Sequence, residues 1–247
     1  MDNIILHIPH SSVFIPFFEG YLISNQHLQN EVNLLTDWYT DEIFDLPYKQ
    51  IITPFSRIFC DVERFPDDSQ EVMSKSGMGM CYTHKDNGEL MREVSPELRL
   101  RIKQFYDQHH ESLEKACSEA LKSHGKVLVI DCHSFPYIPL RRDLIHSMPR
   151  PDFCIGSDIF HTPRKLVDSS IAFLNYKGYT VLENDPYFGT MIPMKYYYNK
   201  NVLGVMIEVN RSLYMQETNG KIDKTDNFNI IRGVIEELIS LLSAKEL

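Results

Sequence analysis

Two side chains that can act as acid, base or metal ligand come directly after the most apolar stretch of the chain. Residues 127–130 (VLVI) are followed by Asp131, Cys132, His133 and Ser134. A short apolar run of this kind is typical of a strand that is buried on both faces of a parallel sheet. Because side chains alternate along a strand, Asp131 and His133 should point to the same side. In open α/β sheets ligands bind beyond the carboxyl ends of the strands, so we expect this pair to line a site.

The same alternation weighs against the neighbouring nucleophiles. Cys132 should point to the opposite, buried side of the strand, and Ser134 shares that side unless the strand has already turned. An alternative for the whole segment is a strand end whose acid and imidazole only cap a neighbouring loop. A site at this strand end therefore needs partners from elsewhere in the chain.

A second histidine follows another predicted strand. Residues 3–8 are largely apolar, and Pro9 blocks further ladder pairing. His10 then lies in a Pro/Ser turn just past a strand end, which makes it a candidate ligand. The alternative is that His10 bonds only within this turn. His7 lies on the other side of Pro9, and we do not expect it to share a face with His10.

An acid occupies the apolar face of a predicted helix. Residues 25–44 carry apolar side chains at intervals of three to four, which indicates a helix. Asp37 lies within that band beside Trp38, where a carboxylate is costly unless a partner neutralises it. The alternative is that Asp37, helped by Thr36, is the N-cap of the second half of a broken helix.

Two further segments place acids beside arginines. Residues 56–64 (SRIFCDVER) contain Arg57 and Arg64 together with two acids. A second buried strand, residues 203–209, leads through Glu208 to Asn210 and Arg211. Arginine is suited to bidentate recognition of carboxylates, so these guanidinium groups are candidates for holding a substrate. The alternative for Arg57 is an internal pair with an acid that staples the loop.

The remaining pattern is that of an α/β domain. Ser95 and Pro96 begin a long amphipathic helix that Gly125 ends, and this helix leads directly into the strand at 127–130. His109 and His110 on this helix are expected to be packing and surface residues. We expect further strands at 48–53, 153–155 and 180–182, and further helices at 165–176 and 226–242. The whole chain, 1–247, is expected to form one domain with a loop or flap excursion at about 66–94.

Composition limits the class of protein. The chain has 247 residues and a formal net charge of −9, which argues against a nucleic-acid partner. No apolar run approaches the roughly 18–20 residues of a membrane span, and the N-terminus lacks the pattern of a secretory signal. The five cysteines show no CxxC spacing and fit reduced thiols. We therefore expect a cytoplasmic protein; its oligomeric state does not follow from the sequence.

Two histidines and one carboxylate are a common ligand set for a catalytic zinc ion that keeps a position open for water. A further carboxylate can then act as general base, while an arginine stabilises the oxyanion of an attacked carbonyl. The candidates are too dispersed along the chain for a short zinc motif such as HExxH. A metal-dependent phosphoesterase is a weaker alternative, because the chain has no Gly-rich phosphate loop.

Five segments together resemble the N-formylglutamate amidohydrolase family: PHSS at 9–12, TDWYTDEIF at 36–44, SRIFCDVER at 56–64, DCHSFP at 131–136 and EVNRSLYM at 208–215. The resemblance implies a three-layer α/β sandwich with a mixed, mostly parallel central sheet of the phosphorylase/hydrolase-like type, similar to zinc carboxypeptidases. It also implies zinc-dependent hydrolysis of an N-acyl amino acid, N-formyl compounds included, or of a short peptide amide, with a zinc-bound water attacking the carbonyl. The substrate would be a small molecule.

The resemblance also implies roles for single residues. His10, Asp37 and His133 would be the zinc ligands, with Asp131 as the reserve carboxylate, and Glu208 would be the general base. The arginines would hold the substrate carboxylate or the oxyanion, with Arg64 as the catalytic one. Substrate-binding residues would be Arg57, Asn210 and Arg211.

Two departures from the family pattern bear on the substrate. Ser12 stands where the family usually has Gly, and Glu63 stands where it usually has Asn. A Glu beside Arg64 adds negative charge, which we expect to disfavour a dianionic substrate. A different class also fits the arginines: a non-catalytic protein that binds a carboxylated ligand on the same scaffold.

Overall fold

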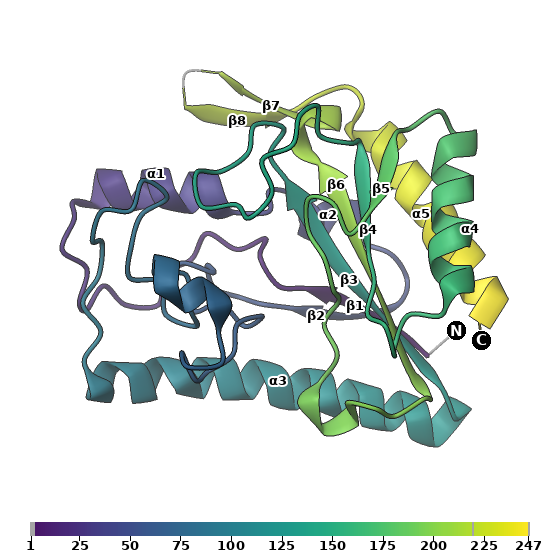
Figure 1. Ribbon diagram of the computed structural model, residues 1–247, viewed down its shortest axis with the longest axis horizontal. Coiled ribbons are helices and arrows are strands. Elements are labelled where there is room, and N and C mark those ends of the chain that lie inside the picture. The colour runs from purple at the N-terminus through teal and green to yellow at the C-terminus, as the bar shows by residue number, and fades with distance from the viewer. Residues whose placement is uncertain (1–2, 219, 247) are drawn as a thin grey trace.

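A six-stranded sheet forms the centre of the molecule in the computed structural model, which describes residues 3–218 and 220–246 (Figure 1). The strand order is β2 (Lys49–Ile52), β1 (Ile4–Ile8), β3 (Val127–Phe135), β6 (Val202–Asn210), β4 (Phe153–Gly156) and β5 (Val181–Glu183). All neighbours are parallel except β4, which runs antiparallel to β6. This confirms the predicted mixed, mostly parallel sheet.

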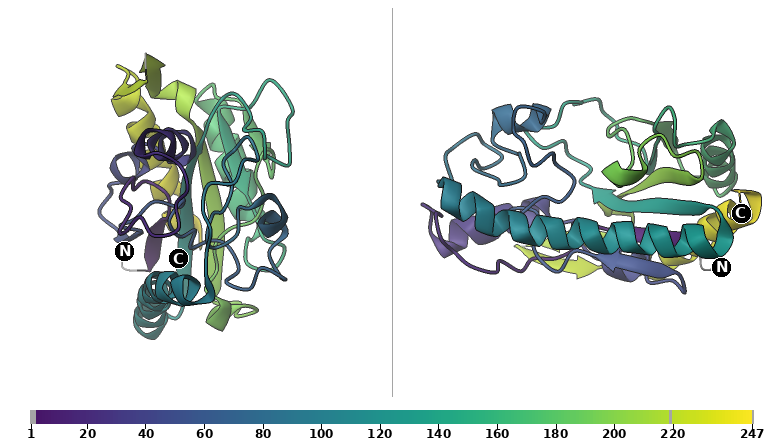
Figure 2. Two further views of the ribbon diagram at one scale, coloured as in Figure 1. Left: turned by 90° about the vertical axis from the view of Figure 1, so that its left-hand side faces the viewer. Right: turned by 90° about the horizontal axis from the view of Figure 1, so that it is seen from below.

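Helices cover both faces of this sheet. On one face, α2 (Thr40–Ile43), α4 (Arg164–Tyr176) and α5 (Phe228–Glu246) share a hydrophobic core with alternate residues of β1, β3 and β6. On the other face, α3 (Pro96–His124) packs through Leu113, Cys117 and their neighbours against Ile5 and Val129. Figures 1 and 2 show α3 running along most of the length of the molecule. Strands β1, β3 and β6 are buried throughout, as their continuous apolar runs predict.

The long helix α3 begins and ends where its sequence indicates. The hydroxyl of Ser95 accepts a hydrogen bond from the backbone N–H of Leu98, and Gly125 adopts φ 75° at the C-terminal end. The first half of α3, through Leu98 and Ile102, packs beside α1 (Asn25–Leu35) in a second core that lies beyond the sheet. Helix α3 therefore joins the sheet to a lobe made mostly of loops.

This lobe contains the segment between β2 and α3. Within residues 53–95, all of which the structure describes, η1 (Val72–Ser76) is the one helical element. Isolated bridges such as Met78 to Tyr82 hold the loops of this segment together. Three short elements follow elsewhere in the chain: η2 (Met194–Tyr196), η3 (Arg211–Leu213) and the hairpin of β7 (Met215–Thr218) with β8 (Lys221–Lys224). The loop lobe faces the carboxyl ends of β1 and β3, so it can supply side chains to a site there.

The prediction of one helix over residues 25–44 is wrong at its centre. Helix α1 ends at Leu35, where the hydroxyl of Thr36 donates a hydrogen bond to the carbonyl of Val32. Helix α2 begins only after Tyr39, which adopts φ 63°. The break turns the side chain of Asp37 away from a capping position and toward β3, where its oxygens contact His133 and Arg211.

Candidate active site

Three adjacent strands deliver the central residues of the site. His7 lies in β1 opposite Asp131 of β3, and His133 of β3 lies opposite Glu208 of β6. His10 follows β1 by two residues, beyond Pro9. All five side chains are buried. The parallel sheet therefore gathers these groups at the carboxyl ends of β1, β3 and β6, as the strand-end residues predict.

The two ring nitrogens of His10 have different surroundings. Its Nε2 lies 2.9 Å from Oδ1 of Asp61. The other oxygen of Asp61, Oδ2, accepts a hydrogen bond from the hydroxyl of Tyr82. Nδ1 of His10 is buried and has no hydrogen-bond partner among the described residues, while Oδ2 of Asp37 lies 3.7 Å away and Oε2 of Glu63 3.6 Å away. With Nε2–H donated to Asp61, the lone pair of Nδ1 faces two carboxylates. A cation between these three groups would satisfy all of them.

His133 contacts carboxylates through both ring nitrogens. Its Nδ1 lies 3.0 Å from Oδ2 of Asp37, and its Nε2 lies 3.1 Å from Oδ1 of Asp131 and 3.2 Å from Oε1 of Glu63. Burial opposes a charge on this ring, but the carboxylates of Glu63 and Asp131 raise the pKa of His133 well above its usual range. Without a metal ion, His133 is thus the cation that this cluster holds.

Asp37 joins the cluster to Arg211. Nη2 of Arg211 donates to Oδ1 of Asp37 at 2.9 Å, which leaves Oδ2 facing His10 and His133. Burial raises the pKa of Asp37, but the nearby imidazoles of His10 and His133 and the charge of Arg211 hold it well below its usual range. Asp37 is therefore an ionised carboxylate with one oxygen directed at two imidazoles.

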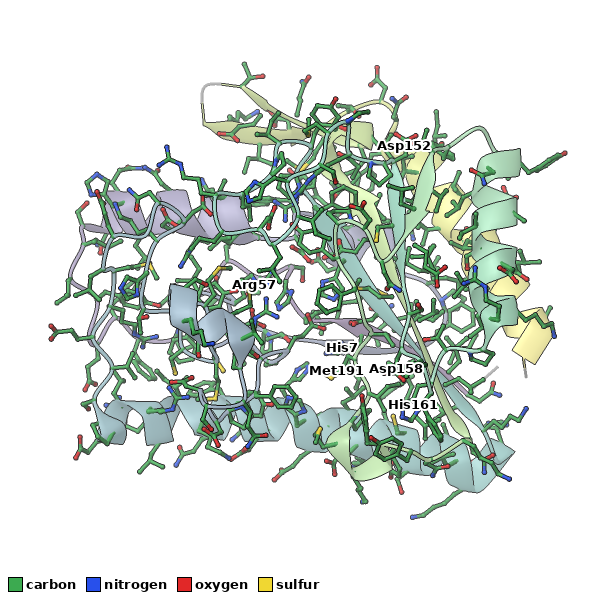
Figure 3. All side chains as sticks on the ribbon, viewed as in Figure 1. His7, Arg57, Asp152, Asp158, His161 and Met191 are labelled. Carbon is green, nitrogen blue, oxygen red and sulfur yellow. The ribbon has the colours of Figure 1, made fainter. Side chains whose placement is uncertain are left out.

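The arginines near the site are largely engaged by the protein itself. Arg57 donates through Nε and Nη2 to Oδ2 of Asp61. This is the internal ion pair that the sequence offered as the alternative to substrate binding by Arg57. Arg211 also donates to the hydroxyl and carbonyl of Ser134 and to the carbonyl of Leu34. Nε of Arg64 lies 3.7 Å from Asp61 and has no hydrogen-bond partner within the described part of the chain. Of the three guanidinium groups, that of Arg64 is the most available to a ligand. Figure 3 labels Arg57, which comes from the loop lobe.

Asn210 has a structural role beside the site. Its side-chain amide donates to the carbonyl of Pro151, and its Oδ1 accepts from the backbone N–H and the hydroxyl of Ser212 at the start of η3. It fixes the turn that places Arg211 beside Asp37.

Glu208 is the least neutralised carboxyl group of the site. It is buried, and its Oε2 has no hydrogen-bond partner among the described residues. Burial raises the pKa of Glu208 to about 8; the charge of His133 opposes this effect and that of Asp37 adds to it. A carboxyl group with a pKa near neutrality can both take and release a proton, which is what a general acid–base residue requires.

The cluster contains more carboxyl groups than guanidinium groups. Five carboxylates converge there, those of Asp37, Asp61, Glu63, Asp131 and Glu208. Three guanidinium groups oppose them, those of Arg57, Arg64 and Arg211. In the metal-free chain, protonation of His133 and of Glu208 offsets the two surplus carboxylates, and one divalent cation would take the place of these two protons. The nitrogen and oxygen donors present are those that zinc accepts.

Two sets of three donors lie close enough to hold a metal ion. One set is His10, Glu63 and His133, and the other is His7, Glu63 and Asp131; within each set the donor atoms lie within 4.8 Å of one another. The sequence indicated neither Glu63 nor His7 as a ligand. His7 and His10, which we did not expect to share a face, both approach the carboxylate of Glu63: Oε1 lies 3.7 Å from His7 and Oε2 lies 3.6 Å from His10.

Comparison with known proteins identifies the chain's relatives. The family model described as FGase, N-formylglutamate amidohydrolase, matches residues 2–215. No curated protein matches the chain. A crystal structure of N-formylglutamate amidohydrolase from Ralstonia eutropha JMP134 is similar, with a TM-score of 0.83, 24% identity, and coverage of 98% of this chain and 93% of that chain. The crystal structure of a gene product from Agrobacterium tumefaciens has a TM-score of 0.65, 20% identity, and coverage of 98% and 91%.

Proposed function

Because the chain belongs to the N-formylglutamate amidohydrolase family, we propose that it is a zinc-dependent hydrolase of a linear amide in an N-acyl amino acid or short peptide. The observation that carries the metal dependence is the buried Nδ1 atom of His10. It has no hydrogen-bond partner among the described residues and faces the carboxylates of Asp37 and Glu63. Such an arrangement is costly in the absence of a cation.

The proposed zinc ligands are Nδ1 of His10, Oδ2 of Asp37 and Nδ1 of His133, with Glu63, which forms a close donor set with the two histidines, as a further ligand. Both nitrogens lie within 3.7 Å of Oδ2 of Asp37. The far nitrogen of each imidazole already has a carboxylate partner, Asp61 for His10 and Asp131 for His133. Ligating histidines in proteins are commonly oriented by such partners. With this ligand set, Asp131 orients the ring of His133 and is not itself a ligand of this zinc ion.

Glu63 takes a different place from the one we expected. Its oxygens lie near the nitrogens of His7, His10 and His133, and no contact joins it to Arg64 within the described residues. Its negative charge therefore acts on the metal-binding cluster rather than on a substrate carboxylate beside Arg64. Glu63 therefore gives no reason to expect weaker binding of a dianionic substrate, and formylglutamate belongs among the substrates to be tested.

A bound zinc ion would polarise the amide carbonyl and acidify water at this site. Glu208 would take the proton from the attacking water and deliver it to the nitrogen of the leaving amine. Its raised pKa suits both steps, because the ionised form that accepts the proton and the protonated form that donates it are both accessible near neutral pH. Arg64 would stabilise the negative charge that develops on the carbonyl oxygen.

The other two arginines would act mainly on the protein. Arg211 would hold Asp37 in place, and Arg57 would hold Asp61. Arg57 retains its Nη1 group, which lies 3.7 Å from Asp37 and makes no hydrogen bond within the described residues, so it can also receive a substrate carboxylate. Asn210 would contribute indirectly, through the turn that positions Arg211.

The setting proposed for this activity is the cytoplasm, which the five free, buried cysteines support. Among the described residues, no helix is long and apolar enough to cross a membrane. The partner is a small-molecule substrate.

The experiment that tests the activity is a substrate screen with zinc-supplemented protein. It covers N-formyl, N-acetyl and γ-glutamyl amino acids, formylglutamate included, and follows release of the free amine. Turnover that is lost in Glu208→Gln supports the proposal. If no amide is hydrolysed while a carboxylated ligand binds the wild type and Glu208→Gln equally well, the chain is a binding protein and the proposal fails.

A further inference from the structure

A second group of donors, His7, Asp131 and Glu63, lies beside the proposed zinc site. Nδ1 of His7 lies 2.8 Å from Oδ1 of Asp131 and 3.7 Å from Oε1 of Glu63. These three atoms come from β1, β3 and the loop lobe, and they lie within 4.8 Å of one another. Separations of about 3–4 Å between donors are those of ligands that surround one ion at roughly 2 Å. The spacing therefore suits a second divalent cation.

Glu63 connects the two groups through separate oxygens. Its Oε2 lies 3.6 Å from Nδ1 of His10, whereas its Oε1 lies 3.7 Å from Nδ1 of His7. A carboxylate with one oxygen directed at each group can bridge two metal ions, as carboxylates do in two-metal hydrolytic sites. No arginine or lysine pairs with Glu63 in the described residues, so its negative charge is left for cations of another kind.

The surroundings of His7 and Asp131 are already those of ligands. Nε2 of His7 lies 2.8 Å from Nε2 of His109, and Nδ1 of His109 lies 3.2 Å from the hydroxyl of Thr53. If His7 donates through Nε2 and His109 accepts there, the proton of His109 is on Nδ1, which donates to the hydroxyl of Thr53. Nδ1 of His7 then carries a lone pair that can bind a metal ion. Oδ2 of Asp131 accepts the backbone N–H of Met191 at 2.8 Å, so Oδ1, which also lies 3.1 Å from Nε2 of His133, is the oxygen that faces the same ion. Figure 3 labels His7 and Met191.

We propose that His7, Asp131 and Glu63 bind a second divalent metal ion, zinc or another transition metal that accepts nitrogen and oxygen donors, with Glu63 bridging the two ions. This inference goes beyond the proposed function and shares Glu63 with it. The competing arrangement is a hydrogen-bonded chain without an ion, in which Thr53 donates to His109, His109 to His7, and His7 to Asp131. The two arrangements differ in the number of ions bound per chain.

The test is the metal content of the full-length protein after dialysis against zinc and removal of free ion, measured by elemental analysis. We expect about two equivalents per chain in the wild type and about one in His7→Gln, which removes a ligand of the second site only. His110→Gln is the matched control, because His110 contacts the carbonyl of Val62 and belongs to neither donor set; it should keep both ions. Circular dichroism checks that each variant folds.

Where His7→Gln does not fold, Glu63→Gln serves instead, since Glu63 is partly exposed. As a bridging ligand it would contact both ions, so its replacement should weaken binding of the second ion at least about tenfold and that of the first ion less, because His10, Asp37 and His133 remain. A wild type that binds one equivalent, lost in His10→Gln and kept in His7→Gln, overturns the second site and leaves the proposed zinc site intact. One equivalent that is lost in His7→Gln and kept in His10→Gln overturns the two-ion arrangement as well. A wild type that binds no ion overturns both.

Discussion

Nε2 of His10 lies 2.9 Å from Oδ1 of Asp61, and this contact decides which nitrogen of His10 is available to a metal ion. Asp61 is fully buried, and its other oxygen, Oδ2, accepts hydrogen bonds from Arg57 and Tyr82. Burial opposes its ionisation, but Arg57, His10 and Arg64 hold the pKa of Asp61 well below its usual range. Asp61 is therefore a permanent acceptor that keeps the proton of His10 on Nε2.

The first prediction concerns this contact. Replacing Asp61 by Asn removes the ionised acceptor, and we expect zinc affinity to fall by about 10- to 100-fold, measured by competition with a chromogenic chelator. Tyr82→Phe removes a hydrogen bond to the same carboxylate without touching His10, and it should leave the affinity nearly unchanged. Equal zinc affinity in Asp61→Asn and wild type would show that Asp61 does not orient the ligand.

The second prediction concerns Glu208 as the acid–base residue. Glu208→Gln keeps the shape of the side chain and removes the titrating group, so kcat should fall by about 10²- to 10⁴-fold. Bound zinc should not change, because Glu208 is not one of the proposed ligands. Steady-state kinetics and metal analysis on the same preparation check both parts. A variant that keeps its kcat would exclude Glu208 from proton transfer.

The third prediction concerns the pH dependence of stability in the metal-free protein. Burial, together with the charge of His7, lowers the pKa of His109 to about 2, so this ring is neutral in the folded chain. In the unfolded chain it takes up a proton below about pH 6.5, so acid favours unfolding. This one group should reduce the unfolding free energy by roughly 2 kcal/mol between pH 6.5 and pH 5.

Denaturant titrations of wild type and His109→Gln at the two pH values measure this effect. The variant should lose less stability on acidification than the wild type, because Gln does not titrate. The same loss in both chains would mean that His109 is protonated in the fold and that the chain of hydrogen bonds through His7 is arranged differently.

The fourth prediction concerns the pair of Asp37 and Arg211. Both side chains are buried, so removing the guanidinium in Arg211→Met leaves an uncompensated carboxylate and should lower the unfolding free energy by about 3–5 kcal/mol. Arg164→Ala is the control, since its pairs with Asp168 and Glu183 are exposed and should add little to stability. Urea unfolding of the metal-free variants makes the comparison. A small effect in Arg211→Met would mean that Asp37 takes up a proton or water instead.

The sequence predicted those parts of the site that follow from local periodicity. Asp131 and His133 were identified because alternation along a buried strand places both on one side, and Glu208 because it ends a second such strand. Asp37 was identified because a charge in an apolar helical band needs a partner. Its partners, His133 and Arg211, lie 96 and 174 residues away, and no local pattern indicates them.

Other parts of the site could not be predicted in this way. His7 and His109 are 102 residues apart, and their contact arises because α3 packs across β1. Glu63 reaches the histidines from an irregular loop, where no periodicity fixes the direction of a side chain. The break between α1 and α2 depends on the positive φ of Tyr39, a conformation that the residue type does not favour.

The most direct test of the claim that amide hydrolysis depends on zinc is reconstitution of the metal-free protein with zinc. Protein stripped with a chelator and then dialysed should not hydrolyse the best substrate from the screen, and adding zinc should restore turnover. His133→Ala should show no restoration at the same zinc concentration, because it removes a proposed ligand and its link to Asp37. Full hydrolysis by the stripped wild type, confirmed as free of divalent metal, would contradict the claim.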